Sequence, residues 1–228
     1  MDVAIAVAVL VVVLLMGVPI PFAFFASTLT IVFLGVYDYT FLLPYGFSKV
    51  SSLILVAIPL FILAGNLMEK SGIGESLINF VDMFVGRIKG GLGAVMVISC
   101  ALFGAISGSG FATLSSIGTI MLPRMYAAGY PRGISSALIY SASLLGLLIP
   151  PSLNMILYAF IGGQSVLACF LATVVPGVIL VILLSTTNWW LLRKNQDIRL
   201  TAKLPRDVYV KTLGKRTVRA IPAMIAPI

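Results

Sequence analysis

The sequence predicts an all-α polytopic membrane protein with a re-entrant helical hairpin, a discontinuous helix and an interfacial amphipathic helix. Two observations carry this prediction. The 228 residues are 60% hydrophobic and only 10% charged, whereas an average soluble domain has about 25% charged residues to cover its surface. The long uncharged runs are also interrupted internally by Gly, Ser and Pro. This composition excludes a soluble domain and a disordered chain.

The formal charge of +8 comes from 15 Lys and Arg against 7 Asp and Glu. Nine of the basic residues lie between Arg193 and Arg219, opposed by Asp197 and Asp207. Because cytoplasmic loops of membrane proteins collect Lys and Arg, we interpret this stretch as a cytoplasmic loop and expect no nucleic-acid partner. The first residues lack the basic region of a cleaved signal peptide, and the orientation of the N-terminus stays open.

Catalytic and metal chemistry are disfavoured by the residue types. The chain has no histidine, and Cys100 and Cys169 each sit inside an apolar run, which suggests neither a disulfide framework nor a transition-metal site. The apolar runs hold no base that could activate a serine or cysteine. We therefore expect no catalytic residue and no enzyme activity. A proton relay is also disfavoured, because no ionisable residue lies in mid-membrane.

Residues 1–89 are predicted to form scaffold-type helices and an arm helix at the membrane interface. The run Val3–Tyr37 exceeds the roughly 20 residues of one span, and Gly17–Pro21 breaks it into two short helices or one kinked helix. Val50–Met68 reads as one span. Over 71–89 apolar residues recur at helical spacing, which predicts an amphipathic helix lying in the interface. An ordinary helix with one exposed face is the alternative.

Residues 90–160 are predicted to form the transport-type region, which begins with a hairpin over 90–123. Its arms, Leu92–Ile106 and Phe111–Leu122, flank a Ser/Gly tip at Ser107–Gly110. Backbone groups freed at this tip survive at membrane depth only inside protein or along a wet cavity, so we predict a re-entrant hairpin. The alternative is one long helix whose small residues form a packing face.

The region continues with a broken helix over 133–160. Pro150 and Pro151 lack amide hydrogens and disfavour helix at Ile149, which predicts two halves, Ile134–Leu148 and Ser152–Phe160. A long span follows over 161–193, kinked at Pro176 and ending at two tryptophans, as interfacial anchors do. Residues 194–219 are then the basic loop, and 220–228 begin a further helix that stops with the chain.

The two breaks suggest an ion and anion site. Carbonyls at half-helix C-termini bind Na⁺ in transporters, and amides at half-helix N-termini face anionic substrates. Oxygen ligands without a carboxylate suit a weakly held monovalent ion. The alternative is that Ser and Gly here serve only close helix packing, and spacing alone leaves both open. The groups on offer are the hydroxyls of Ser107 and Ser109, the backbone of Gly108, Gly110, Gly146 and Ile149, and the side chains of Ser152 and Asn154.

Five stretches resemble one transporter family over essentially the whole chain: Met16–Phe24, Ala57–Met68, Gly104–Pro123, Gly129–Tyr130 and Leu145–Ala159. They are similar to the large membrane (M) subunit of tripartite ATP-independent periplasmic (TRAP) transporters of the dicarboxylate type. The resemblance implies a Na⁺-coupled permease of the bacterial inner membrane that works by an elevator mechanism. Its implied partners are a small four-helix membrane subunit and a periplasmic binding protein that delivers a dicarboxylate, keto acid or sialic acid.

The resemblance also implies roles for individual residues. The first Na⁺ site would consist of Ser107, Gly108, Ser109, Gly146, Ile149 and Pro150, and the substrate would be faced by Gly110, Thr113, Ser152 and Asn154. Two positions depart from the family pattern: Gly110 stands where Ser or Ala is frequent, and Thr113 replaces a frequent Asp.

The resemblance implies two inverted repeats, of which this sequence holds the first. A second half of the large subunit is therefore an expected partner, without which the chain should not transport. Two alternatives stay open: a related anion transporter with the same hairpin architecture, and a non-transporting structural component of the membrane. Na⁺ is the only small cofactor expected, as coupling ion.

Overall fold

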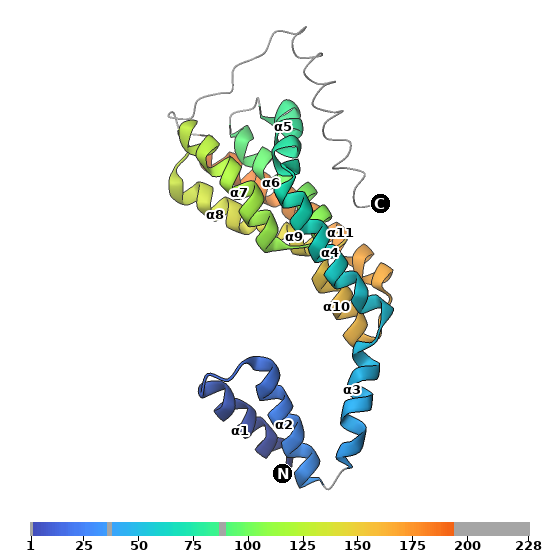
Figure 1. Ribbon diagram of the computed structural model, residues 1–228. Coiled ribbons are helices and arrows are strands. Elements are labelled where there is room, and N and C mark those ends of the chain that lie inside the picture. Colours follow the sequence, from blue (N-terminus) through green and yellow to red (C-terminus); the bar gives the residue numbers. More distant parts are fainter. Residues whose placement is uncertain (1, 36–37, 87–89, 194–228) are drawn as a thin grey trace. The chain divides into compact units, whose positions relative to one another are not determined.

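The computed structural model describes residues 2–35, 38–86 and 90–193, and in these ranges all regular elements are helices, with no strand (Figure 1). The predicted all-α class is thus confirmed for this part of the chain. The chain divides into two compact units, Met1–Ser52 and Leu53–Ile228. The predicted division into scaffold-type helices over 1–89 and a transport-type region over 90–160 concerns function and not compactness, and it stays a prediction.

The first unit begins with two short apolar helices, α1 (Asp2–Leu15) and α2 (Ile20–Leu34), which pack against one another. Between them Gly17 has a φ of +81°, a left-handed conformation that only glycine adopts without strain. The Ser27 hydroxyl donates a hydrogen bond to the Ala6 carbonyl at 2.9 Å. The predicted break is therefore real, and of its two interpretations the one with two separate helices is confirmed.

The same unit ends with two elements that the sequence analysis did not predict, the 3₁₀ turn η1 (Tyr39–Phe41) and the helix α3 (Leu42–Val50). The Asp38 carboxylate accepts a hydrogen bond from the Thr40 amide at 2.9 Å and so caps η1. Pro44 lies in the first turn of α3, where its missing amide hydrogen removes no helical hydrogen bond.

The second unit is built around one central helix. This helix, α6, packs against α4, α5, α7, α8, α9 and α11, and Figure 1 shows these helices as one bundle. Because α6 is apolar all round, it is a helix suited to burial, and Val95, Val97 and Phe103 are 0% exposed. The helices of this unit are α4 (Leu53–Lys70), α5 (Ile73–Val85), α6 (Gly91–Ser107), α7 (Gly110–Ala127), α8 (Arg132–Ser143), α9 (Leu145–Leu148), α10 (Leu153–Gly162) and α11 (Val166–Leu192).

The amphipathic helix exists as α5, and its apolar face is occupied by protein. Leu77, Ile78 and Val81 are buried in the core that α5 forms with α6 and α7, whereas Phe84 is exposed. The apolar face of α5 thus packs against the bundle, and its other face is exposed. This packing is what the alternative interpretation, an ordinary helix with one exposed face, predicts. An interfacial position in the membrane stays a prediction.

A polar contact also ties α5 to α7. The Arg124 guanidinium donates to the Asn79 side-chain oxygen at 3.1 Å and lies 3.5 Å from the Glu75 carboxylate. The side chains of Arg124 and Glu75 are 36% and 61% exposed. Water therefore screens this pair, and exposed pairs contribute about 0.2–1 kcal/mol.

We expect Arg124→Ala to lower the free energy of unfolding by less than about 1 kcal/mol, because an exposed ion pair is worth little. Denaturant unfolding in detergent micelles measures this value. Glu75→Gln is the matched control: it removes the charge partner but leaves the contact with Asn79, so its effect should be smaller still. If Arg124→Ala lowers the free energy of unfolding several times more than this, the polar contact holds α5 against the bundle and the burial of its apolar face is not the main cause.

One helix in the described part of the chain is by itself long and apolar enough to cross a membrane. It is α11, with 27 residues, and Ser165 caps its start by accepting a hydrogen bond from the Ala168 amide at 3.4 Å. The predicted long span is thus confirmed in its helical extent, with Pro176 inside it. The predicted basic loop over 194–219, the beginning of a helix over 220–228 and the end of the arm helix at 87–89 lie outside the described residues.

Candidate functional site

The break between α6 and α7 consists of two residues. Helix α6 ends at Ser107, Gly108 has a φ of +60°, and the Ser109 hydroxyl accepts a hydrogen bond from the Ala112 amide at 3.4 Å to cap α7. Glycine tolerates the left-handed conformation that ends a helix, and serine is a favoured N-cap. The alternative of one continuous helix is therefore wrong.

The two helices fold back on one another. Beyond the end of α7, the Tyr130 hydroxyl lies beside the backbone amides of Leu92 and Gly93 at the start of α6. The helices also pack along their lengths. The break at Gly108 and Ser109 is consequently the tip of this pair, which we call the α6–α7 tip.

The α6–α7 tip gathers oxygen atoms of two buried residues, Ser107 and Thr113, around the half-buried Ser109. The Thr113 hydroxyl donates to the Ser109 carbonyl at 2.8 Å and lies 3.4 Å from the Ser107 hydroxyl. The Ser107 hydroxyl in turn donates to the Ser109 carbonyl at 3.3 Å and accepts from the Ser109 amide at 3.4 Å. Ser107 is 2% exposed and Thr113 is 0% exposed.

The second break separates the helix formed by α8 and α9 from α10. Arg132–Leu148 and Leu153–Gly162 meet at an angle of 45°, which confirms the predicted discontinuous helix. Pro150 and Pro151, joined by a cis peptide bond, fill the break and supply no amide hydrogen. The Ser152 hydroxyl donates to the Leu147 carbonyl at 2.6 Å and so satisfies one of the carbonyls left free at the end of α9.

The α6–α7 tip contacts this second break directly. The Leu153 amide donates to the Gly108 carbonyl at 3.4 Å. A Cβ atom on Gly146 would lie 2.6 Å from the Thr113 hydroxyl and 2.8 Å from the Ser109 carbonyl oxygen, and a Cβ on Gly104 would overlap the Gly146 backbone. Only residues without a side chain allow this approach.

Four helix ends therefore meet in one place: α6 and α9 end there, while α7 and α10 begin there. Helix C-termini carry partial negative charge from free carbonyls, and N-termini carry partial positive charge from free amides. Such a site offers neutral oxygens to a cation and amides to an anion. Within the described ranges no three His, Cys, Asp or Glu residues come together in a group that could hold a metal ion.

The residues predicted for the cation site lie on both sides of this meeting point. Ser107, Gly108 and Ser109 form the tip, and Gly146 lies against the Ser109 carbonyl. Ile149 and Pro150 lie at the end of α9, and a Cβ on Gly177 of α11 would lie 3.1 Å from the Ile149 side chain, so Ile149 also packs against α11. The family-implied role of these residues in binding Na⁺ stays a prediction.

The residues predicted to face the substrate occupy different surroundings. Thr113 lies within the oxygen cluster of the tip, Ser152 is 0% exposed with its hydroxyl on Leu147, and Asn154 is exposed on α10. Gly110 lines a small, mostly apolar hollow of about 90 Å³ between α7 and the helix formed by α8 and α9.

Two residues of the site were not among the predicted ligands. Gly65 of α4 approaches the tip so closely that its Cβ would lie 3.4 Å from the Ser107 carbonyl oxygen, and Gly104 faces Gly146. Thr113 was assigned a different role, although its spacing of four residues from Ser109 places both on one helical face. Gly65 lies in one of the family-like stretches, and this was its only signal in the sequence.

Comparison of the sequence with known proteins identifies a family. The family model described as "Tripartite ATP-independent periplasmic transporter, DctM component" matches residues 7–228. The chain is 40% identical over 162 residues to the C4-dicarboxylate TRAP transporter large permease protein DctM of Rhodobacter capsulatus, which covers 65% of this chain and 37% of the relative. It is 44% identical over 129 residues to the ectoine TRAP transporter large permease protein TeaC of Halomonas elongata, covering 57% of this chain and 30% of the relative.

The chain thus spans well under half of the length of these relatives, both of which are named as transporter permeases. The match to the family model, in contrast, extends over nearly the whole chain. The chain belongs to the DctM family of tripartite ATP-independent periplasmic transporters, a family of membrane permeases.

Proposed function

We propose that this chain supplies a Na⁺ site and part of the substrate path of a TRAP-type permease in the bacterial inner membrane, which takes up an organic acid. The meeting of four helix ends at the α6–α7 tip and the second break carries this proposal. Broken helices of secondary transporters use such ends to bind coupling ions and anionic substrate groups.

In this proposal the cation lies between the tip and the end of α9. One side of the site consists of the Ser107 and Thr113 hydroxyls and the Ser109 carbonyl. The other side consists of the carbonyls of Gly146 and Ile149, next to Pro150, where the helix breaks. All of these oxygens are neutral, which suits a monovalent ion that must be released again. We therefore assign Thr113 to the cation, because its hydroxyl is 0% exposed and already lies on Ser109.

The substrate lies, in this proposal, where α7 and α10 begin. The first turns of both helices direct amide groups to that place, and helix N-termini attract anions. Gly110 lines the hollow beside α7, and Asn154 is exposed on the first turn of α10. An organic acid of the dicarboxylate, keto acid or sialic acid type fits this polarity, and the names of the relatives include C4-dicarboxylate and ectoine.

The proposed assembly has three further members: a small four-helix membrane subunit, a periplasmic binding protein that delivers the acid, and the second half of the large permease. The family description, with its words tripartite and periplasmic, supports this assembly.

We also propose that the α6–α7 pair enters the membrane and returns to the same side. Helix α6 has 17 residues and rises about 1.5 Å per residue, which is short for a hydrocarbon core of about 30 Å. We further propose that transport occurs by an elevator mechanism. The support for this mechanism is the resemblance to the TRAP transporter family.

A chimaera tests the proposal. The chain replaces the matching region of the Rhodobacter capsulatus relative, and uptake of radiolabelled C4-dicarboxylate is measured in cells with the relative's other components. We expect uptake that requires Na⁺ and stops when choline replaces it. Uptake that is indifferent to Na⁺ would refute the coupling. No uptake, together with no Na⁺-dependent thermal shift of the purified chain, would favour a non-transporting structural component.

A further inference from the structure

Helix α6 begins without a capping side chain of its own. Its N-cap is Gly90, which has a φ of +82° and makes no side-chain hydrogen bond to the first turn. The first amides of a helix have no carbonyl partner within that helix, and a buried amide without a partner costs free energy. Gly90, Gly91 and Gly93 are all buried. The start of α6 therefore needs hydrogen-bond partners from elsewhere in the chain.

The tyrosine that follows α7 is the first of these partners. Gly129, with a φ of +85°, follows the end of α7, and the Tyr130 amide donates to the Met125 carbonyl at 3.0 Å. This helix cap turns the chain back. The Tyr130 hydroxyl accepts hydrogen bonds from the Leu92 and Gly93 amides, and Tyr130 is 4% exposed. Tyr130 thus binds the end of α7 through its amide and the start of α6 through its hydroxyl.

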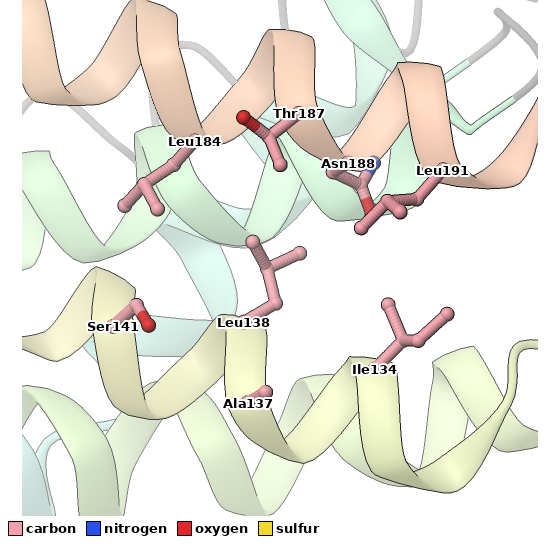
Figure 2. Close-up of a pocket in the computed structure, with 8 residues that line it drawn as sticks. All are labelled: Ile134, Ala137, Leu138, Ser141, Leu184, Thr187, Asn188 and Leu191. Carbon is pink, nitrogen blue, oxygen red and sulfur yellow. The ribbon is translucent and has the colours of Figure 1, made fainter.

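An asparagine of α11 is the second partner. The Asn188 side-chain nitrogen donates to the Gly90 carbonyl at 3.0 Å. Asn188 is 2% exposed and lies so close to α6 that a Cβ atom on Gly93 would overlap its amide. Figure 2 shows Asn188 at the edge of a hollow between α8 and α11 that is lined mainly by apolar side chains. If α6 moved away, the Asn188 nitrogen would therefore find few hydrogen-bond partners nearby.

We call the start of α6, with Tyr130 and Asn188, the base of the α6–α7 pair, and its contacts are stronger than those of the tip. Among the described residues, a single hydrogen bond joins the tip to the second break, from the Leu153 amide to the Gly108 carbonyl at 3.4 Å. This length exceeds the usual range of about 2.7–3.2 Å. The approach of Gly146 to the tip is a packing contact. Opening the tip breaks one long hydrogen bond, whereas opening the base breaks two at Tyr130 and one at Asn188.

We propose that Tyr130 and Asn188 form a clasp that keeps the base closed, so that the α6–α7 pair opens at its tip. The tip then moves away from the second break while the start of α6 stays in place, and the four helix ends separate. Closure of the tip brings them together again. The clasp therefore determines which end of the pair moves. This inference follows from the contacts at the two ends and does not rest on Na⁺ coupling.

Amide hydrogen exchange of the purified chain in choline chloride tests the proposal, because it measures how often each segment opens. Protection factors, which correct for the intrinsic exchange rates, are compared between residues 92–97 at the base and residues 108–113 at the tip. We expect at least about tenfold higher protection at the base, since its opening leaves more buried groups unpaired. Equal protection of the two segments, or higher protection of the tip, would overturn the proposal.

Tyr130→Phe removes the hydroxyl of the clasp and keeps the ring. Protection over 92–97 should fall by about 10- to 100-fold, the usual effect of leaving buried amides unpaired, while protection over 108–113 stays unchanged. Tyr126→Phe is the matched control, since it removes a hydroxyl that lies 3.2 Å from the Ser136 hydroxyl in an exposed place. This control should leave both segments as they are.

Asn188→Leu removes the other part of the clasp with a side chain of similar size, and it replaces Tyr130→Phe as the test should that variant not fold. It should lower protection over 92–97 in the same way. Unchanged protection of the base in either variant would show that these contacts do not hold it closed. An equal fall in both segments would show a general loss of stability, and the clasp would then not select the end that opens.

Discussion

Gly146→Ala is expected to lower the free energy of unfolding by about 1–3 kcal/mol, the usual cost of overpacking a well-packed contact. A Cβ atom at this position would lie 2.6 Å from the Thr113 hydroxyl and 2.8 Å from the Ser109 carbonyl oxygen. The tip cannot yield easily, because the Gly108 carbonyl is also bonded to the Leu153 amide. The added methyl group should therefore push the α6–α7 tip away from α9 and abolish any Na⁺ effect on stability.

Gly133→Ala is the matched control, since it makes the same change at the start of the same broken helix. A Cβ at Gly133 would meet no atom within 4 Å. Alanine favours a helix over glycine by up to about 1 kcal/mol, so this variant should be equally or slightly more stable. Unfolding by sodium dodecyl sulphate in mixed micelles, followed by circular dichroism, measures both. Equal stability of the two variants would mean that the tip and the break are not in contact.

Ser107→Ala and Thr113→Val are each expected to raise the Na⁺ concentration needed for half-maximal thermal stabilisation by about 10- to 100-fold. Each change removes one buried hydroxyl from the oxygen cluster and barely alters the volume. An interaction with a charged group is worth about 1.5–3 kcal/mol, and about 1.4 kcal/mol corresponds to a factor of ten. The measurement is a melting curve of the purified chain over a range of NaCl, with KCl keeping the ionic strength constant.

Ser136→Ala is the control for these hydroxyl deletions. Ser136 is exposed on α8, where its hydroxyl lies 3.2 Å from that of Tyr126. Its loss should leave the Na⁺ dependence unchanged. If Ser107→Ala and Thr113→Val both retain the original Na⁺ dependence, the cation lies elsewhere and these oxygens serve helix packing only.

The breaks in the helices could be located from the sequence because their causes are local. Gly17, Gly108 and the Pro150–Pro151 pair end helices through backbone properties of the residues themselves. The structure places a break at each of them. The short helix α3 carries no comparable signal, since Pro44 and Gly46 both have low helix propensity and no side chain caps its start.

The contacts between the elements were not predictable from one sequence. Nothing local indicates that Gly104 and Gly146 face one another, or that Gly65 of α4 approaches the Ser107 carbonyl. The amphipathic pattern of α5 has the same limitation, because an apolar face looks identical whether lipid or protein covers it. In the structure the bundle covers Leu77 and Val81.

Amide hydrogen exchange of the purified chain, compared in NaCl and in choline chloride, tests most directly whether the tip and the second break hold one Na⁺ ion together. A ligand that binds the folded state slows local opening of the segments that it contacts. We predict slower exchange in NaCl in both segments, residues 104–113 and 145–154, with no change in α11. Unchanged exchange in both segments, or protection of one segment alone, would contradict a shared site.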